Sequence, residues 1–232
     1  MPTHGVIFDI DGTLVDTNPA HVEAWRRAFR RFDFEVPSER IKREIGKGGD
    51  KLVPSILGNE VEARCGEALR TAQKEEFLAI ARREHFRVFP GVEEIFPALH
   101  DRGIRTALAT SSDDKHLKAT LKSAGLDLTK LADVVVTKSD ATASKPDPDL
   151  VEVAVEKLGL APGECVMVGD TVYDAAASRA AGVAFIGLLS GGTPATELLD
   201  AGAIAVWNDI AHLLAELDRA LELASLAGAV TE

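Results

Sequence analysis

Two carboxylates stand one residue apart at the end of an apolar run near the N-terminus. The segment GVIFDIDG begins with Val6, Ile7 and Phe8, which predict a buried strand, and Asp9 and Asp11 follow almost directly. Carboxylates this close repel each other, and removing each one from water costs free energy unless a partner compensates. The segment therefore predicts a strand end at which a cation collects.

The rest of the chain alternates between short apolar runs and segments with helical spacing. Further apolar runs lie at 106–109, 134–136, 166–168, 183–188 and 204–206, and helical segments at about 91–102, 113–124, 147–158, 172–181 and 209–224. Alternation at this length indicates βαβ units and a parallel sheet that is covered on both faces. We therefore expect an α/β fold with a Rossmann-like parallel core.

One interval, from Thr17 to Phe89, breaks the alternation because it contains helical signals and no convincing strand. The pattern predicts an all-helical cap subdomain over residues 17–88, inserted into an α/β core made of residues 1–16 and 89–232. The alternative is that these helices coat the sheet.

The net charge and the cysteine content indicate which classes of partner and which cellular compartment to expect. The chain has 26 basic and 37 acidic residues and a net charge of −11, which disfavours nucleic acid and anionic membrane surfaces as partners. No apolar stretch approaches the ~18 residues of a membrane span. Cys65 and Cys165 form no disulfide framework, so we expect reduced thiols and a cytoplasmic protein. A monomer is the default expectation.

Polar residues follow several of the predicted strands. Thr110 and Ser111 come after the second strand, and Asp170 and Asp174 after the fourth, while Lys145 lies in SKPDPD. Singly, each has an ordinary explanation as a turn, a helix cap or a surface lysine. Ligands of open parallel sheets bind beyond the carboxyl ends of the strands, so the joint placement predicts one site there.

This set of side chains suits phosphoryl transfer. Mg²⁺ prefers oxygen ligands, which Asp9 and Asp170 would supply. Asp9 would attack phosphorus as a carboxylate nucleophile, while Lys145 and Thr110 stabilise the transferring group. Asp11 would protonate the leaving oxygen and then deprotonate the attacking water.

Four segments, DIDGTLVDT, ATSS, SKPDPD and GDTVYD, resemble in their order and spacing the motifs of the haloacid dehalogenase superfamily. The similar subgroup contains phosphoglycolate phosphatases and β-phosphoglucomutases and carries an α-helical cap. The resemblance implies that Asp9 is the nucleophile and a Mg²⁺ ligand, and that Asp11 is the general acid/base and binds the metal through its backbone carbonyl. It implies that Thr110 and the Ser111 amide bind the phosphoryl group and that Lys145 neutralises charge. It also implies that Asp170 is a metal ligand and that Asp174 supports the metal shell.

Asp11 also separates this chain from two sister groups. Dehalogenases and phosphonatases of the superfamily lack an Asp at this position, so the resemblance implies phosphate-ester chemistry. The segment GLLSGGTPATELLDAGA also resembles phosphoglycolate phosphatase-like members.

The predicted cap contains two features that hold three candidate substrate contacts. In IGKGGDKLV, Lys47 and Lys51 would face an anion; the alternative is a helix cap with both lysines in solvent. His21 matches a β-phosphoglucomutase position that assists the residue matching Asp11, although some phosphatases share it. The Arg that mutases carry in the glycine-containing loop is not evident here.

We therefore expect a Mg²⁺-dependent phosphatase that acts on a small phosphorylated metabolite through an aspartyl-phosphate. The alternative within the same fold is a β-phosphoglucomutase-like phosphoryl transfer on a sugar phosphate. A catalytically silent binding module is a third reading, which the intact Asp9, Asp11, Lys145 and Asp170 oppose.

Overall fold

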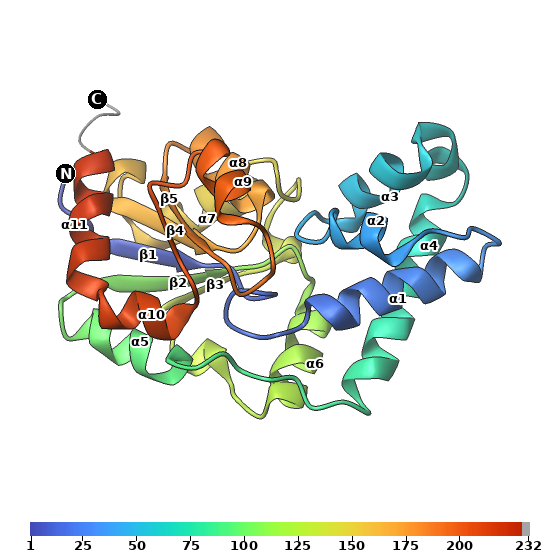
Figure 1. Ribbon diagram of the computed structural model, residues 1–232, viewed down its shortest axis with the longest axis horizontal. Coiled ribbons are helices and arrows are strands. Elements are labelled where there is room, and N and C mark those ends of the chain that lie inside the picture. Colours follow the sequence, from blue (N-terminus) through green and yellow to red (C-terminus); the bar gives the residue numbers. More distant parts are fainter. Residues whose placement is uncertain (229–232) are drawn as a thin grey trace.

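The computed structural model describes residues 1–228 and contains one six-stranded parallel sheet (Figure 1). The strand order is β3-β2-β1-β4-β5-β6. The strands are β1 (Gly5–Phe8), β2 (Arg105–Ala109), β3 (Val134–Val136), β4 (Cys165–Gly169), β5 (Ala184–Leu188) and β6 (Ala205–Trp207). All six predicted runs are strands, and the predicted α/β class is confirmed.

Helices cover both faces of the sheet, and the central strand explains why. Alternate side chains of β1 point to opposite faces, so Val6 and Phe8 enter one apolar core while Ile7 enters the other. The first core is covered by α5 (Val92–His100), α6 (Asp114–Ala124), α10 (Ile210–Ala215) and α11 (Leu217–Gly228). The second is covered by α7 (Asp149–Leu158), α8 (Val172–Ala180) and α9 (Ala195–Asp200). Short 3-10 turns lie at Leu128–Lys130, Lys138–Asp140 and Pro162–Glu164.

The C-terminal part differs from the sequence expectation in two places. The single helix expected over 209–224 is two helices, because Glu216 leaves the helical conformation (φ −116°, ψ 27°). The break lets α10 pack against α5 while α11 packs along β5. Helix α9 was not predicted, because its six residues are too few to show a helical period.

Four helices stand apart from the sheet in Figure 1: α1 (Asn18–Arg30), α2 (Ser38–Lys42), α3 (Gly49–Leu57) and α4 (Asn59–Ala81). They enclose an apolar core of their own, in which Trp25 and Phe29 of α1 meet Leu52 of α3 and Leu69 of α4. The helices therefore do not simply coat the sheet. The exact domain limits, 17–88 against 1–16 and 89–232, stay a prediction.

Two further features bear on the predicted location. Within residues 1–228, no helix combines the length and apolar character that crossing a bilayer requires. Cys65 and Cys165 are both free thiols, as predicted.

Candidate active site

Three neighbouring strands deliver polar residues to one edge of the sheet. Phe8, the last residue of β1, is in register with Leu108 of β2 and Val168 of β4. The chain continues from these strand ends into Asp9, Thr110 and Asp170, so residues about 100 and 160 positions apart become neighbours. We call the resulting group the strand-end site, which contains Asp9, Asp11, Thr110, Lys145, Asp170 and Asp174.

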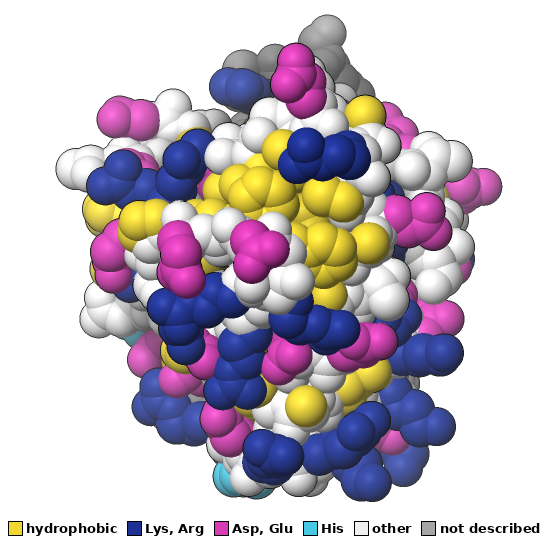
Figure 2. Space-filling view, turned by 90° about the vertical axis from the view of Figure 1, so that its right-hand side faces the viewer, with side chains coloured by type: hydrophobic (Ala, Val, Ile, Leu, Met, Phe, Trp, Pro, Cys, Tyr) yellow, Lys and Arg dark blue, Asp and Glu magenta, His cyan; other side chains and the backbone are white. Residues whose placement is uncertain are grey.

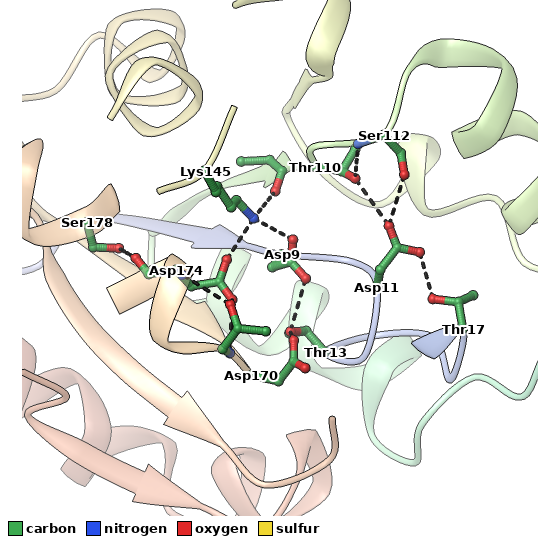
Figure 3. Close-up of polar contacts among 12 residues, drawn as sticks. Asp9, Asp11, Thr13, Thr17, Thr110, Ser112, Lys145, Asp170, Asp174 and Ser178 are labelled. Atoms are coloured by element: carbon green, nitrogen blue, oxygen red, sulfur yellow. Dashed lines mark hydrogen bonds and ion pairs between the residues drawn. The ribbon is translucent and has the colours of Figure 1, made fainter. Parts of the chain in front are cut away.

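Lys145 connects two of the carboxylates (Figure 3). Its side chain is 1% exposed, and its Nζ lies 2.5 Å from Asp9 Oδ1, 2.8 Å from Asp174 Oδ1 and 3.1 Å from the carbonyl oxygen of Ala109. A lysine ammonium has three N–H donors, and here each faces one acceptor. The residue is therefore a fixed internal cation and not a solvated surface lysine.

Asp174 holds its position because it also caps a helix. Its Oδ2 accepts hydrogen bonds from the backbone N–H of Thr171 (3.0 Å) and from the Thr171 hydroxyl (2.6 Å), which forms a capping box at the start of α8. The other oxygen, Oδ1, faces Lys145. One carboxylate thus ties the lysine to the helix that follows β4.

Thr13 and Asn18 also belong to the site, and the sequence analysis missed both. The Thr13 hydroxyl donates to Asp170 Oδ1 at 2.9 Å and lies 3.3 Å from Asp9 Oδ2 (Figure 3). The side-chain amide of Asn18 donates to Asp170 Oδ2 at 3.2 Å. Thr13 stands inside the DIDGT motif and was open to prediction, whereas Asn18 is recognisable only once α1 is placed.

The acidic part of the site holds more negative charge than Lys145 balances. Asp9, Asp170 and Asp174 are buried, and each offers an oxygen that lies within 4.8 Å of the others. Burial raises the pKa of Asp9 to about 7, with Lys145 opposing the rise and Asp174 and Asp11 adding to it. Burial, then the charges of Asp174 and Asp9, raises the pKa of Asp170 well above its usual value. Oxygen donors with uncompensated charge are compatible with a divalent cation.

The Asp11 carboxylate turns away from this cluster. Its Oδ1 accepts from the Thr17 hydroxyl (2.6 Å) and lies 3.2 Å from His21 Nε2, while its Oδ2 lies within 3.3 Å of the hydroxyls of Thr110 and Ser112. Burial alone would raise the pKa of Asp11, but the charge and hydrogen bond of His21 and the hydroxyls lower it below its usual value. A metal contact of Asp11 through its backbone carbonyl stays a prediction.

A cavity of about 270 Å³ lies between the strand-end site and the four inserted helices. Asp9, Asp11 and Ser111 line it from the sheet side, and the Ser111 hydroxyl is buried without a hydrogen-bond partner in the described chain. The segment Ile45–Asp50 and the middle of α4 line it from the other side.

Two glycines let the Ile45–Asp50 segment lie close both to the loop at Ser144 and to helix α4. A Cβ on Gly48 would fall 2.1 Å from the Ser144 hydroxyl, and one on Gly49 would fall 2.9 Å from Arg70 Cγ. Both distances are shorter than carbon contacts permit, so only glycine fits without a shift. The glycines of IGKGGDKLV thus allow a close approach to Ser144 and Arg70.

The three predicted cap residues lie in different settings. His21 contacts Asp11 as described and stacks on Phe77 with ring centroids 4.2 Å apart. Lys47 lines the cavity, but its Nζ pairs with Glu44 and donates to Ser55. Lys51 is not among the lining residues and pairs with Asp147 at 2.6 Å. Substrate contact by all three stays a prediction.

Most polar residues around the cavity carried no signal in the sequence. We call them the cavity wall: Lys47, Asp50, Arg70, Lys74, Asp113, His116 and Lys138. Apart from Lys47, they resemble ordinary surface residues of helices and turns. Only the position of α4 over α6 and the strand ends brings them together.

The chain is thus an α/β protein with buried carboxylates and a buried lysine at the carboxyl ends of its central strands, an acidic centre that is compatible with a divalent cation. The chain belongs to the haloacid dehalogenase-like hydrolase family, whose model matches residues 3–182. The family and the relatives below indicate that it is a phosphatase.

Relatives of known name cover nearly the whole chain. A phosphoglycolate phosphatase of Rhodospirillum rubrum is 32% identical over 216 residues, which cover 90% of this chain and 88% of that protein. A phosphorylated carbohydrates phosphatase of Thermotoga maritima is 30% identical and covers 87% of this chain and 92% of its own.

Solved structures agree on the fold. A hydrolase from Pseudomonas syringae superposes with a TM-score of 0.86 at 32% identity, covering 94% of this chain and 99% of its own. A β-phosphoglucomutase from Clostridium difficile has a TM-score of 0.80 and covers 97% and 98%. Its 17% identity supports the shared fold alone.

Proposed function

We propose that this chain is a Mg²⁺-dependent phosphatase that hydrolyses the phosphate ester of a small metabolite through an aspartyl-phosphate on Asp9. The observation that carries the proposal is the buried contact of Asp9 with Lys145 at 2.5 Å, beside Asp170 and Asp174. The relatives named for phosphoglycolate and for phosphorylated carbohydrates support a small phosphorylated substrate.

In the first step, a carboxylate oxygen of Asp9 forms a bond to phosphorus, and the bond from phosphorus to the ester oxygen breaks. Burial raises the pKa of Asp9, and the positive charge of Lys145 opposes that rise and so favours the ionised nucleophile. Mg²⁺ held by Asp9, Asp170 and the Asp11 backbone carbonyl would supply positive charge to the phosphoryl oxygens. Thr110 and the backbone amide of Ser111 would bind those oxygens, and Ser111 lines the cavity beside Asp9.

Asp11 would move the protons. It gives its proton to the departing alcohol, then takes one from the water that attacks the aspartyl-phosphate and releases phosphate. In the free enzyme the hydrogen bonds to Asp11 lower its pKa. The negative charge of a bound phosphate would raise that pKa, so the acid form becomes accessible when substrate arrives.

A phosphate-release assay with p-nitrophenyl phosphate tests the proposal directly. We expect turnover with Mg²⁺ and none with EDTA, and loss of turnover in Asp9→Asn. Asp16→Asn is the matched control, because Asp16 lies in the same segment but pairs with Arg87 at 3.0 Å, away from the strand-end site. Full activity of Asp9→Asn, or activity in EDTA equal to that with Mg²⁺, would refute the mechanism.

A β-phosphoglucomutase-like transfer is the second candidate, and the contact of His21 with Asp11 at 3.2 Å favours it. The test is incubation with β-glucose 1-phosphate and a trace of β-glucose 1,6-bisphosphate. Glucose 6-phosphate as the product would select the mutase, and inorganic phosphate would select the phosphatase.

Location and oligomeric state remain predictions. The two free thiols support a reducing compartment such as the cytoplasm. The expected monomer is checked by light scattering of the purified chain.

A further inference from the structure

The four cations that line the cavity away from the strand-end site are all paired with carboxylates. Arg70 Nη1 lies 2.7 and 2.9 Å from the two carboxylate oxygens of Glu62. The remaining pairs are Lys47 with Glu44, Lys74 with Asp113, and Lys138 with Asp50 at 3.9 Å.

Negative charge near the cavity at least equals the positive charge. Glu67 also lines the cavity, and no cation among residues 1–228 pairs with it. The outer face of the inserted helices shows a similar mixture, with Lys and Arg side chains interleaved with Asp and Glu (Figure 2). Counted with Glu44 and Glu62, which lie outside the lining, the carboxylates leave no surplus cation in the cavity wall to offer a ligand.

The strand-end site has no surplus positive charge for a ligand either. Its carboxylates are Asp9, Asp11, Asp170 and Asp174, against Lys145 alone. With Asp11 in the acid form that the proposed first step requires, the other three carboxylates carry three negative charges, which Lys145 and a divalent ion would balance. The reacting phosphoryl group would itself interact with the ion, so a second anionic group on the substrate would find no surplus positive charge in the strand-end site.

What the wall does offer is a mixture of hydrogen-bond donors and acceptors. Asp113 Oδ1 caps α6 and binds His116 Nδ1 at 3.2 Å, and its other oxygen binds Lys74. The hydrogen bond of His116, opposed by burial and followed by that of Lys74, holds the pKa of Asp113 well below its usual range, so Asp113 stays charged. Lys74 uses one N–H on Asp113 and has others to donate.

Two further groups fit the same kind of ligand. His116 lines the cavity, and its Nε2 is buried with no hydrogen-bond partner in the described chain. Trp25 lines the cavity as well, and its indole ring is an apolar surface beside these polar groups. Neutral groups that both donate and accept, such as hydroxyls on a carbon skeleton, satisfy such a wall without adding charge.

We propose that the alcohol part of the substrate is neutral and polyhydroxylated, and that the paired cations of the cavity wall select against a second anionic group such as a carboxylate or another phosphate. This inference rests on the proposed phosphatase function and names the substrate class for that site.

Two pairs of phosphate esters that differ only in one charged group test the inference. Glycerol 3-phosphate and 3-phosphoglycerate differ by a hydroxymethyl group in place of a carboxylate, and so do 2-hydroxyethyl phosphate and phosphoglycolate. We expect kcat/KM with Mg²⁺ at low ionic strength to favour the neutral member of each pair at least tenfold. Equal values, or a preference for the carboxylate, would overturn the inference.

A variant that removes the carboxylate partner of one cavity-wall cation tests whether the ion pairing causes this substrate preference. Glu62→Gln removes the partner of Arg70 and should raise the relative kcat/KM for 3-phosphoglycerate over glycerol 3-phosphate at least threefold. Glu75→Gln is the matched control, because it removes one of the two carboxylate partners of Arg31, which does not line this cavity. If Glu62→Gln melts well below the wild-type temperature, Glu44→Gln, which removes the carboxylate partner of Lys47, is measured instead. A ratio that moves in neither cavity variant, or moves equally in Glu75→Gln, contradicts the inference.

The same assays separate this inference from the proposed function. If neither these esters nor p-nitrophenyl phosphate releases phosphate with Mg²⁺, the proposed function itself fails. If p-nitrophenyl phosphate is hydrolysed but the carboxylate esters are preferred, or if a sugar bisphosphate is required, only the inference fails.

Discussion

Lys145 and Lys74 both pair with aspartates, but in different surroundings. Lys145 is 1% exposed and joins Asp9 and Asp174, whereas Lys74 leaves 30% of its side chain in solvent and pairs with Asp113. The first pairing lies among surplus carboxylates, and the second is balanced within the cavity wall. The strand-end site is thus arranged to attract positive charge, whereas the cavity wall together with Glu44 and Glu62 presents polar groups without net positive charge.

This difference in charge balance predicts different roles for the strand-end site and the cavity wall. A buried site that lacks positive charge gains binding energy from a cation and orients one phosphoryl group. A half-exposed wall of balanced pairs gains little from charge, because solvent screens each pair. Changes in the strand-end site should therefore have large effects on turnover or stability, and changes in the wall should alter substrate preference modestly.

The largest effect is expected from Asp9→Asn. Removing the proposed nucleophile should lower kcat for p-nitrophenyl phosphate by at least about 10³-fold, since a lost nucleophile leaves only binding and electrostatic contributions. Initial rates with Mg²⁺ measure it, with a thermal melt to show that the variant is folded. A loss of less than tenfold in a folded variant would place the nucleophile elsewhere.

Lys145→Met should have the largest effect on stability. It leaves Asp9 and Asp174 buried without their cation, which costs about 3–5 kcal/mol when a buried pair loses one partner. Urea unfolding in EDTA gives the value. Lys130→Met, which removes an exposed pair with Asp127, is the control and should leave the unfolding midpoint nearly unchanged. Similar midpoints for both variants would show that Lys145 is not an essential internal cation.

Metal and pH should act on the same carboxylates. Because the folded pKa of Asp9 is raised from 3.8 to about 7, the folded metal-free protein binds more protons than the unfolded chain between these values. The free energy of unfolding in EDTA should therefore fall as the pH rises from about 4 to 7. At pH 7.5, Mg²⁺ at 100 times its dissociation constant should restore about 2.7 kcal/mol.

Asp170→Asn tests whether the Asp170 carboxylate contributes to the stabilisation by Mg²⁺. The substitution removes one crowded carboxylate, so the metal-free variant should melt at or above the wild-type temperature and lose most of the Mg²⁺-induced shift. Scanning calorimetry with and without Mg²⁺ measures both quantities. An unaltered shift in the variant would contradict metal binding at this cluster.

The smallest effect is expected in the cavity wall. Lys47→Ala should raise KM about two- to tenfold by removing an amine that lines the cavity, and Lys51→Ala should raise KM less, because Lys51 lies outside the lining. Steady-state kinetics on one sugar phosphate compare them. A larger effect from Lys51→Ala would mean that the cap shifts position when substrate binds.

The sequence predicted the α/β fold well because its signals are local. Each of the six strands is a short apolar run, and the residues after β1, β2 and β4 meet because the sheet is parallel and these strands are neighbours. The long helix expected over 209–224 was wrong, since one non-helical residue, Glu216, divides it. A single break of this kind leaves no mark on the apolar period.

The sequence by itself determined the sheet, and it predicted the helical insertion and the proposed roles of Asp9, Asp11, Lys145 and Asp170, because these depend on short patterns and on residue types at strand ends. Only the tertiary structure decided which charges are left unbalanced. The pairing of Arg70 with Glu62, of Lys74 with Asp113 and of Lys47 with Glu44 depends on how helices pack and on which side chains fall within a few ångströms. Coulombic energy depends on that distance and on burial, and neither can be read from the order of residues.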